Sequence, residues 1–383
     1  MSDNIARQFS EFIATTIRSL PAGEQQFILQ QLGAGAFGTT AAKPDHSGPF
    51  VQGDSWAACS GAKPSAGTVI NGYEILRVFE PGGFSFGAKA KAPDGKIVLL
   101  RKYKRPGGGS PWLDGFIAHH HEIRRRVIAD PAAQDLCLGS LENFVMSKEG
   151  GEVPLKAFYQ VFEWLEGGKD LRTVLDELKL SPNAYDWNQR LIIAREILFA
   201  VNALHNVGIV HSDLKPEHFI LGHWASTSGK YNWRLCGFDF SLVEGQQAPW
   251  HAHGEGYVGT PGYMSPEHLA GMVPTKASDV FTLGLILGEL LAGAHPAAPA
   301  MDTYDKQIEN NQLKSVNVHL AGANGNEQHL LALNRGINAA LDLDPMKRPS
   351  VAELLAVVVQ LAGLDPRGVE VTASAIEQLI PKQ

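Results

Sequence analysis

The chain has 383 residues, 44% of them hydrophobic and 19% charged, and its formal net charge is −7 at pH 7. This length allows two or three domains with a large buried core, and the negative charge excludes nucleic-acid binding driven by bulk charge. Its three cysteines, Cys59, Cys137 and Cys236, match no metal-binding spacing and are typical of a reducing compartment. The N-terminus lacks an apolar secretory block, and the most apolar stretch, Val280 to Gly293, is too short to span a bilayer. We therefore expect a cytoplasmic protein without nucleic-acid or membrane partners.

The N-terminal part of the chain divides into two segments. Residues 1–32 carry apolar side chains at helical spacing and are predicted to be a helical segment. Residues 33–67 are rich in Gly, Ala, Ser and Pro without a sustained period, which is typical of a linker. Leu32 to Gly38 matches a glycine-rich nucleotide loop, but the strands that such a loop needs on both sides are missing, so we prefer the linker interpretation.

A strand-rich region follows the linker, and a mostly helical region begins at Leu171. We expect strands at Tyr73–Phe79, Ala88–Ala92, Ile97–Tyr103 and Ala157–Leu165, and a helix at Leu113–Ile128. Glu166-Gly167-Gly168 is the expected hinge between the two regions.

Three motifs lie near the middle of the chain: HSDLKPEH at residues 211–218, LCGFD at 235–239 and GTPGYMSPE at 259–267. In this order and spacing they resemble the catalytic loop, the metal loop and the end of the activation segment of the eukaryotic-type protein kinase family. The resemblance implies an α+β fold, a two-lobed kinase-like domain over residues 68–364, with a small lobe at 68–165 and a large lobe at 166–364. A tail at residues 365–383 would follow it.

The catalytic loop keeps two residue types that this family uses. The resemblance makes Asp213 the candidate base and Lys215 the lysine that steadies the transferring phosphoryl group. An alternative is that Asp213 only holds the loop by hydrogen bonds. The Lys-Pro-Glu sequence after Asp213 resembles the Ser/Thr branch of the family. Ser212 replaces the arginine that reads a phosphorylated activation segment, so we do not expect control by that route.

The resemblance also implies a nucleotide site, with ATP as the candidate ligand. Its residues would be Gly82, Gly83, Arg101, Glu122, Glu163, Leu165, His218 and Asp239. Only one of the three glycines of the family's phosphate loop remains, because Glu80 and Ser85 replace the other two. Arg101 stands where the family has its phosphate lysine, although a shift of one residue would place Lys102 there. Glu122 stands where that lysine has its acidic partner.

The two metal-binding positions of the family carry His218 and Gly237. Magnesium prefers oxygen ligands, so neither residue suits it. An alternative alignment takes Asp239-Phe240-Ser241 as the metal loop and makes Asp239 a metal ligand, but the first alignment keeps the neighbouring apolar residues in their usual places. Magnesium binding is therefore not expected. The adjacent histidines His119 to His121 point in different directions on a helix, and we expect them to face solvent.

Residues that would support the fold are present. Glu267 is expected to pair with Arg348, and Asp279 to cap the helix that follows it and to brace the catalytic loop. The sequence therefore predicts a pseudokinase that regulates or scaffolds a protein partner, with weak or metal-independent nucleotide binding. The alternative is an active Ser/Thr kinase that transfers the γ-phosphate of ATP to a protein hydroxyl, with Asp213 as base and Asp239 as metal ligand. A third alternative transfers another group, such as a nucleotide, onto protein.

Overall fold

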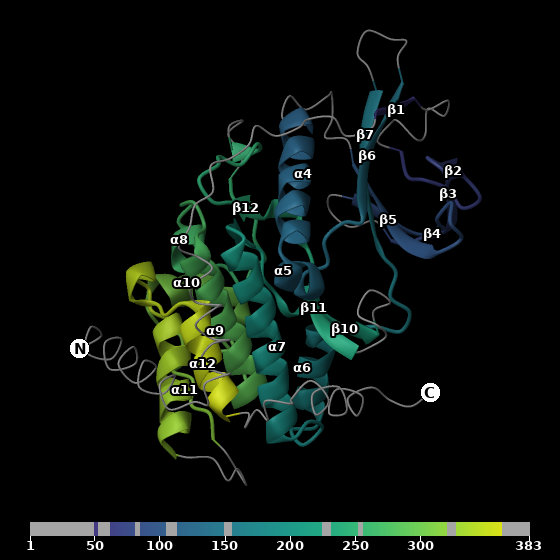
Figure 1. Ribbon diagram of the computed structural model, residues 1–383. Helices are drawn as coiled ribbons and strands as arrows, with labels where there is room; N and C mark the ends of the chain where they lie inside the picture. The colour runs from purple at the N-terminus through teal and green to yellow at the C-terminus, as the bar shows by residue number, and fades with distance from the viewer. Residues whose placement is uncertain are drawn as a thin grey trace.

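The computed structural model describes residues 50–52, 62–80, 85–104, 113–148, 155–223, 231–251, 256–319 and 327–361. These form a small lobe built on a twisted sheet and a larger helical lobe, so the predicted two-lobed α+β fold is confirmed (Figure 1). The predicted N-terminal helices, the loop at 32–38, Gly82, Gly83 and the tail lie outside the described residues. None of the helices in the described ranges is both long and apolar enough to cross a membrane.

The sheet of the small lobe has seven strands in the order β1-β6-β7-β5-β4-β3-β2. Their bounds are Phe50–Gln52 (β1), Val69–Ile70 (β2), Tyr73–Val78 (β3), Ser85–Lys91 (β4), Ile97–Tyr103 (β5), Glu142–Lys148 (β6) and Leu155–Glu163 (β7). All neighbours pair antiparallel except β1, which pairs parallel with β6. Since β1 falls within the predicted linker, part of that segment is a strand of the sheet. The prediction also missed β6, whose sequence lacks a clear polar–apolar alternation.

The large lobe packs around one very apolar helix. This helix is α9, at Lys276–Ala292. The other helices, and the strands outside the sheet of the small lobe, are α4 Leu113–Ala129, α5 Pro131–Leu136, β8 Lys169–Asp170, α6 Leu171–Leu180, α7 Trp187–Asn206, β9 Ile209–Val210, β10 Phe219–His223, β11 Tyr231–Leu235, β12 Leu242–Val243, α8 Pro266–Leu269, α10 Tyr304–Glu309, α11 Glu327–Ala340 and α12 Val351–Leu361. Helix α9 is buried on all sides from Ser278 to Leu291, as expected of a helix at the centre of a lobe. Helix α4 stands between the sheet of the small lobe and the large lobe (Figure 1).

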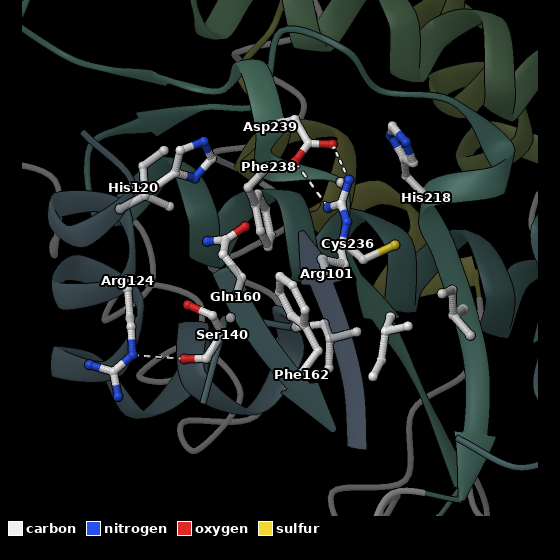
Figure 2. A pocket seen from close by; sticks show the side chains of 16 residues that line it. Arg101, His120, Arg124, Ser140, Gln160, Phe162, His218, Cys236, Phe238 and Asp239 are labelled. Carbon is white, nitrogen blue, oxygen red and sulfur yellow. Dashed lines mark hydrogen bonds and ion pairs between the residues drawn. The ribbon is translucent and has the colours of Figure 1, made fainter. Parts of the chain in front are cut away.

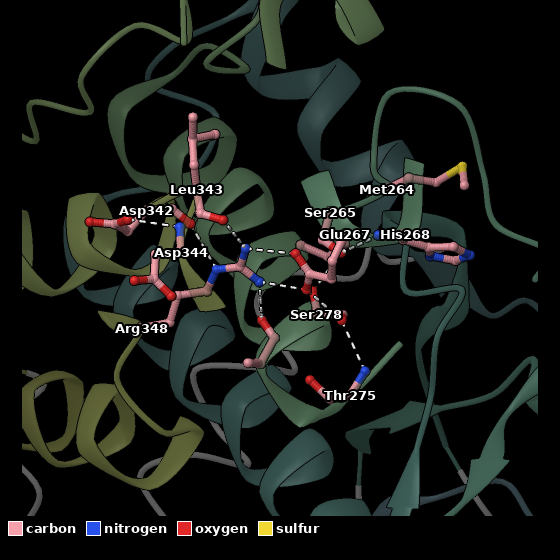
Figure 3. Close-up of polar contacts among 12 residues, drawn as sticks. Met264, Ser265, Glu267, His268, Thr275, Ser278, Asp342, Leu343, Asp344 and Arg348 are labelled. Atoms are coloured by element: carbon pink, nitrogen blue, oxygen red, sulfur yellow. Dashed lines mark hydrogen bonds and ion pairs between the residues drawn. The ribbon is translucent and has the colours of Figure 1, made fainter. Parts of the chain in front are cut away.

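The expected pair between Glu267 and Arg348 is confirmed. Both guanidinium Nη atoms of Arg348 donate to the carboxylate of Glu267, each at 2.8 Å, and the Ser278 hydroxyl donates to the same carboxylate at 2.6 Å (Figure 3). The Arg348 side chain is fully buried. This bidentate ion pair joins the start of α8 to the segment that precedes α12.

Asp279 supports the catalytic loop as predicted. Its carboxylate accepts hydrogen bonds from the backbone N–H groups of His211 at 2.7 Å and Ser212 at 2.9 Å. The predicted capping role is wrong, because α9 begins at Lys276 and its N-cap is Thr275, which forms a capping box with Ser278. The helix starts one turn earlier than its apolar run suggested, so Asp279 lies inside the first turn.

Candidate functional site

An arginine–aspartate pair closes one end of the cleft between the lobes. Arg101 of β5 donates from Nη1 to Oδ1 of Asp239 at 2.9 Å and from Nη2 to Oδ2 at 2.8 Å (Figure 2). The Tyr103 hydroxyl also donates to Asp239, and the Ser85 hydroxyl accepts from Arg101 Nη2 at 2.8 Å. About one fifth of each charged side chain is exposed, 21% for Arg101 and 20% for Asp239. Both charges of the pair are therefore already matched within the protein.

This pair also fixes the charge states of its members. Burial alone would raise the pKa of Asp239, but the charge and hydrogen bonds of Arg101, with the hydrogen bond of Tyr103, hold that pKa well below its usual range. Burial opposes the charge on Arg101, yet Asp239 keeps the pKa of the guanidinium raised. Burial, with the nearby carboxylate, raises the pKa of Tyr103, which therefore stays a hydrogen-bond donor. At neutral pH, Arg101 and Asp239 therefore form an ion pair whose charges cancel, and the protonated hydroxyl of Tyr103 donates a hydrogen bond to it.

The period of two in β5 places Arg101 in the cleft. Burial alternates along this strand, so Val98, Leu100 and Lys102 lie on its buried face while Leu99 and Arg101 line the cleft. Lys102 is 1% exposed and donates to the carbonyl oxygen of Ala62 at 2.8 Å. The structure thus places the side chain of Arg101, and not that of Lys102, in the cleft.

Glu122 does not pair with Arg101. Its carboxylate accepts from Arg125 at 2.7 and 2.8 Å and from Arg126 at 2.7 Å, all on α4 itself. The reason is the phase of the helix, since Phe116, His120 and Ile123 form its buried face and Glu122 lies to the side. The expected acidic partner is therefore replaced by Asp239, which comes from the other lobe.

His119 and His120 do not face solvent, contrary to the expectation. They are 5% and 2% exposed. His119 Nε2 lies 2.8 Å from the carbonyl oxygen of Ser241, whereas His120 Nε2 is buried without a hydrogen-bond partner. Burial lowers the pKa of His120 to about 3, so this ring is neutral. Neutral imidazole serves here as a packing group, and the described residues contain no cluster of three His, Cys, Asp or Glu side chains suited to a metal.

The two metal positions of the family are filled in a way that does not suit magnesium. Gly237, at φ +88°, offers no carboxylate, and a Cβ atom built on it would lie 2.6 Å from Nε2 of His218. The His218 ring is held by its Nδ1, which lies 2.8 Å from the carbonyl oxygen of Asp213. Burial, with the nearby His211 and Lys215, lowers the pKa of His218 to about 3. A neutral imidazole thus takes the space of the missing carboxylate, while Asp239 is held by Arg101. These residues do not fit a magnesium ion.

Replacing Gly237 with aspartate is expected to lower the free energy of unfolding by about 1–3 kcal/mol, because the new side chain collides with His218. Chemical denaturation measures the change. Gly245→Asp is the matched control, since Gly245 has a similar φ of +76° but no atom within 4 Å of an added Cβ. The double variant Gly237→Asp, His218→Asn should regain part of the lost free energy of unfolding, because the smaller side chain leaves room for the new aspartate. Equal losses for the Gly237 and Gly245 variants would contradict the proposed collision.

Hydrogen bonds hold the catalytic loop on both sides of Asp213. The Thr260 hydroxyl donates to Oδ1 of Asp213 at 2.6 Å, and the backbone on the N-terminal side of Asp213 is held by Asp279. Asp213 and Lys215 are both partly exposed. This arrangement suits a base that receives a proton, and it suits a loop held by hydrogen bonds equally well, so both interpretations of Asp213 stay predictions.

A cavity of about 280 Å³ lies beside the Arg101–Asp239 pair. It reaches between β5, β7 and α4, and its lining includes the predicted site residues Arg101, His218 and Asp239 (Figure 2). Glu163 and Leu165 do not line it. Glu163 instead accepts from Arg234 at 3.1 Å, and the Leu165 side chain packs against the buried pair Leu138 and Phe162.

Three residues of this site were missed by the sequence analysis. Tyr103 and Ser85 bond to the central pair, and His120 lines the cavity. The period of two in β5 places Tyr103 two residues from Arg101 and could have indicated it. His120 belongs to the apolar stripe of α4 and was set aside only because histidine is usually polar.

Comparison with known proteins identifies the family of the chain. The model of the protein kinase domain family matches residues 147–358, which is more than half of the chain. Human cyclin-dependent kinase-like 5 is 29% identical over 246 residues, covering 63% of this chain and 22% of that protein. Cyclin-dependent kinase-like 2 of Rattus norvegicus is 33% identical over 236 residues, covering 61% of this chain and 41% of that protein. A probable serine/threonine protein kinase IRE of Arabidopsis thaliana is 28% identical over 252 residues, covering 60% of this chain and 20% of that protein. The chain thus spans about a fifth to two fifths of the length of these relatives, and it belongs to the protein kinase family.

Proposed function

We propose that this protein is a pseudokinase, a kinase-fold regulator or scaffold that binds a protein partner in the cytoplasm. Its nucleotide binding is weak or independent of metal. The observation that carries the proposal is the bidentate pair between Arg101 and Asp239. Asp239, the acidic residue of the LCGFD motif at 235–239, is therefore already paired with a cation of the protein itself.

The charges of the cleft explain why magnesium-dependent transfer is not favoured. Phosphoryl transfer depends on cations that neutralise the charge on the phosphates. To use Arg101 for this, ATP must first separate it from Asp239, which leaves a mostly buried carboxylate without its partner, and separation of such a pair is costly. To use Asp239 for magnesium, the protein must instead leave Arg101 without its partner. Either step opposes the binding of a metal–nucleotide complex.

The mechanism of such a regulator is a shift between arrangements of the two lobes. The Arg101–Asp239 pair joins the small lobe to the loop after β11, so it favours one closed arrangement. A protein partner that binds this closed arrangement more tightly than the other lobe arrangements stabilises it. The equilibrium between the arrangements then shifts by the difference between the partner's affinities for them. The similarity to a probable serine/threonine protein kinase of Arabidopsis thaliana supports a protein as the binding partner.

A thermal-shift titration with ATP tests the proposal directly. We expect ATP to raise the melting temperature little, and to the same extent with magnesium as with a chelator. The Asp239→Asn variant gives the matched control, because it keeps the shape of the side chain and removes its charge. A stabilisation by ATP that requires both magnesium and Asp239 would contradict the proposal.

One observation favours a second function, that of an active Ser/Thr kinase. Asp213 and Lys215 are present and partly exposed, and the loop that carries them is braced by Asp279. Transfer of radiolabel from the γ-phosphate of ATP to protein, with Asp213→Ala as control, decides this. Labelling that disappears in the Asp213→Ala variant would establish kinase activity. Labelling that is absent from the parent chain, or that the substitution leaves unchanged, would exclude this second function.

A further inference from the structure

Two asparagine side chains hold a short segment of backbone between α10 and α11. The backbone N–H of Val316 donates to Oδ1 of Asn338 at 2.9 Å, and Nδ2 of Asn338 donates to the carbonyl oxygen of Val316 at 2.7 Å. Asn334 makes the same two bonds with Val318, at 2.7 and 3.2 Å. Both asparagines belong to α11, which lies at the end of the large lobe far from the sheet (Figure 1). We name residues 314–319 the clamped segment.

The spacing of the bonded residues shows that the clamped segment is extended. Residues four apart on a helix are separated by about 6 Å along its axis, and residues two apart on a strand by about 6.6 Å. The two asparagines therefore face the two valines in register, as a neighbouring strand would. Val316 is 6% and Val318 1% exposed, and a Cβ atom built on Gly288 of α9 would lie 2.9 Å from Val316. The valine side chains thus anchor the segment in the lobe.

The edge of the clamped segment that faces away from α11 is open. In an extended chain the N–H and C=O groups of successive residues point to opposite sides, so those of Ser315, Asn317 and His319 point away from α11. All three residues are exposed, and within the described parts of the chain no hydrogen bond involves their backbone groups. This edge therefore presents alternating donors and acceptors in an extended conformation, which is the template that a strand of another chain needs.

The charge of the clamped segment indicates which strand fits its open edge. Lys314 is exposed, and none of residues 312–319 is acidic. A second copy of the segment would bring two lysines to one ladder, and lysines at an edge discourage such pairing. Acidic side chains on a neighbouring strand would instead be attracted. Because the segment is already held in place, binding costs mainly the ordering of the partner. An extended acidic segment is therefore favoured over a second copy.

We propose that the clamped segment is a docking edge to which an extended, acidic segment of a protein partner adds as a strand. This inference rests on the proposed function, because it names the surface by which the regulator holds its partner. The N–H and C=O groups of Ser315, Asn317 and His319 supply the affinity, and Lys314 supplies the preference for acidic side chains. None of these residues lines the cavity of the cleft. The partner therefore binds whatever the cleft contains.

The test is the fluorescence anisotropy of a labelled synthetic peptide, Asp-Thr-Val-Thr-Val-Thr-Asp, titrated with the full chain. Asn317→Pro removes the outward N–H at the centre of the edge and should weaken binding about tenfold. Asn317→Ala is the matched control, since it removes the same side chain but keeps the N–H, and should bind like the parent chain. Asn338→Ala opens one half of the clamp and should also weaken binding, because the segment is then less well held.

Two altered peptides separate backbone pairing from charge. Methylation of every backbone amide keeps the side chains and removes the donors, so it should abolish binding. Lysine in place of both aspartates keeps the donors and should weaken binding, because these side chains then meet Lys314.

The opposite results would overturn the proposal. Tight binding of the methylated peptide would show that the backbone is not recognised, and equal loss in Asn317→Pro and Asn317→Ala would assign the effect to the side chain. Absence of peptide binding would show that the edge is not a docking site. A dimer of the parent chain that Asn317→Pro abolishes, seen in analytical ultracentrifugation, would assign the edge to a second copy. If Asn317→Pro does not fold, Asn338→Ala and the methylated peptide still decide.

Failure of this proposal differs from failure of the proposed function. Stabilisation by ATP that requires magnesium would reject the proposed function and leave peptide binding unchanged. Loss of peptide binding would reject the docking edge and leave the response to ATP unchanged.

Discussion

Replacing Asp239 with alanine is expected to lower the free energy of unfolding by about 3 kcal/mol, because it leaves the Arg101 guanidinium in the cleft without its acidic partner. Urea denaturation measures the change. The pair joins residues 138 positions apart in the chain and two lobes of the fold, so we also expect a loss of cooperativity between the lobes. Few single substitutions at the cleft should have a larger effect.

Two controls distinguish the loss of this ion pair from the loss of any negative charge. Asp94→Ala removes a carboxylate that pairs with Lys96 on the surface, where the side chain is 55% exposed, and should leave stability unchanged. The double variant Arg101→Met, Asp239→Ala removes both charges and should regain much of the loss, since it leaves no buried charge behind. A double variant as unstable as Asp239→Ala alone would show that Asp239 acts through packing and not through its charge.

Replacing Arg348 with alanine is expected to cost about 3–5 kcal/mol of the free energy of unfolding, because Glu267 then keeps a buried charge without a partner. The guanidinium makes two bonds of 2.8 Å to Glu267 and further bonds to the carbonyl oxygens of Asp342 and Ala277 (Figure 3). Lys347→Ala is the matched control, since the neighbouring cation is 36% exposed and its ion pair is 3.8 Å long. A comparable loss in both variants would contradict the assigned role.

The same pair should give a recognisable pH dependence. Burial alone would raise the pKa of Glu267, but hydrogen bonds from Arg348 and Ser278 lower that pKa to about 2. A carboxylate whose pKa is lower in the folded state contributes stability at pH values above its unfolded pKa, and this contribution is lost as the pH falls towards the folded value. Stability of the parent chain should therefore fall between about pH 4.5 and pH 2, and Glu267→Gln should flatten that part of the profile. A profile unchanged by the substitution would contradict the assignment.

The sequence predicted well those features that depend on local pattern. The alternation in β5 and the helical period of α4 follow from side-chain spacing, and so does the apolar character of α9. The absence of a metal-binding carboxylate at Gly237 was visible in the sequence as well. The predicted pairing of Glu267 with Arg348 and the predicted bracing of the catalytic loop by Asp279 are both confirmed by the observed hydrogen bonds.

The features that the sequence did not predict depend on contacts between distant segments. Arg101 and Asp239 were each singled out, but nothing local indicates that they pair with each other instead of with Glu122 and a metal. The phase of α4 was misjudged because buried neutral histidines take apolar positions, which the usual polarity of histidine conceals. The bonds from Asn334 and Asn338 to the clamped segment likewise become visible only after α11 and that segment are assembled.

The central proposal is that none of the cleft carboxylates that the structure describes binds a divalent cation beside a nucleotide, because Asp239 is paired with Arg101. Crystals grown with ATP and manganese chloride test this most directly, since manganese occupies magnesium sites and its anomalous scattering locates it. We predict that Arg101 and Asp239 remain paired and that no anomalous peak lies beside Asp239. A peak at about 2.1 Å from a carboxylate oxygen of Asp239, with Arg101 turned towards the phosphates, would contradict the account and restore a metal-dependent kinase.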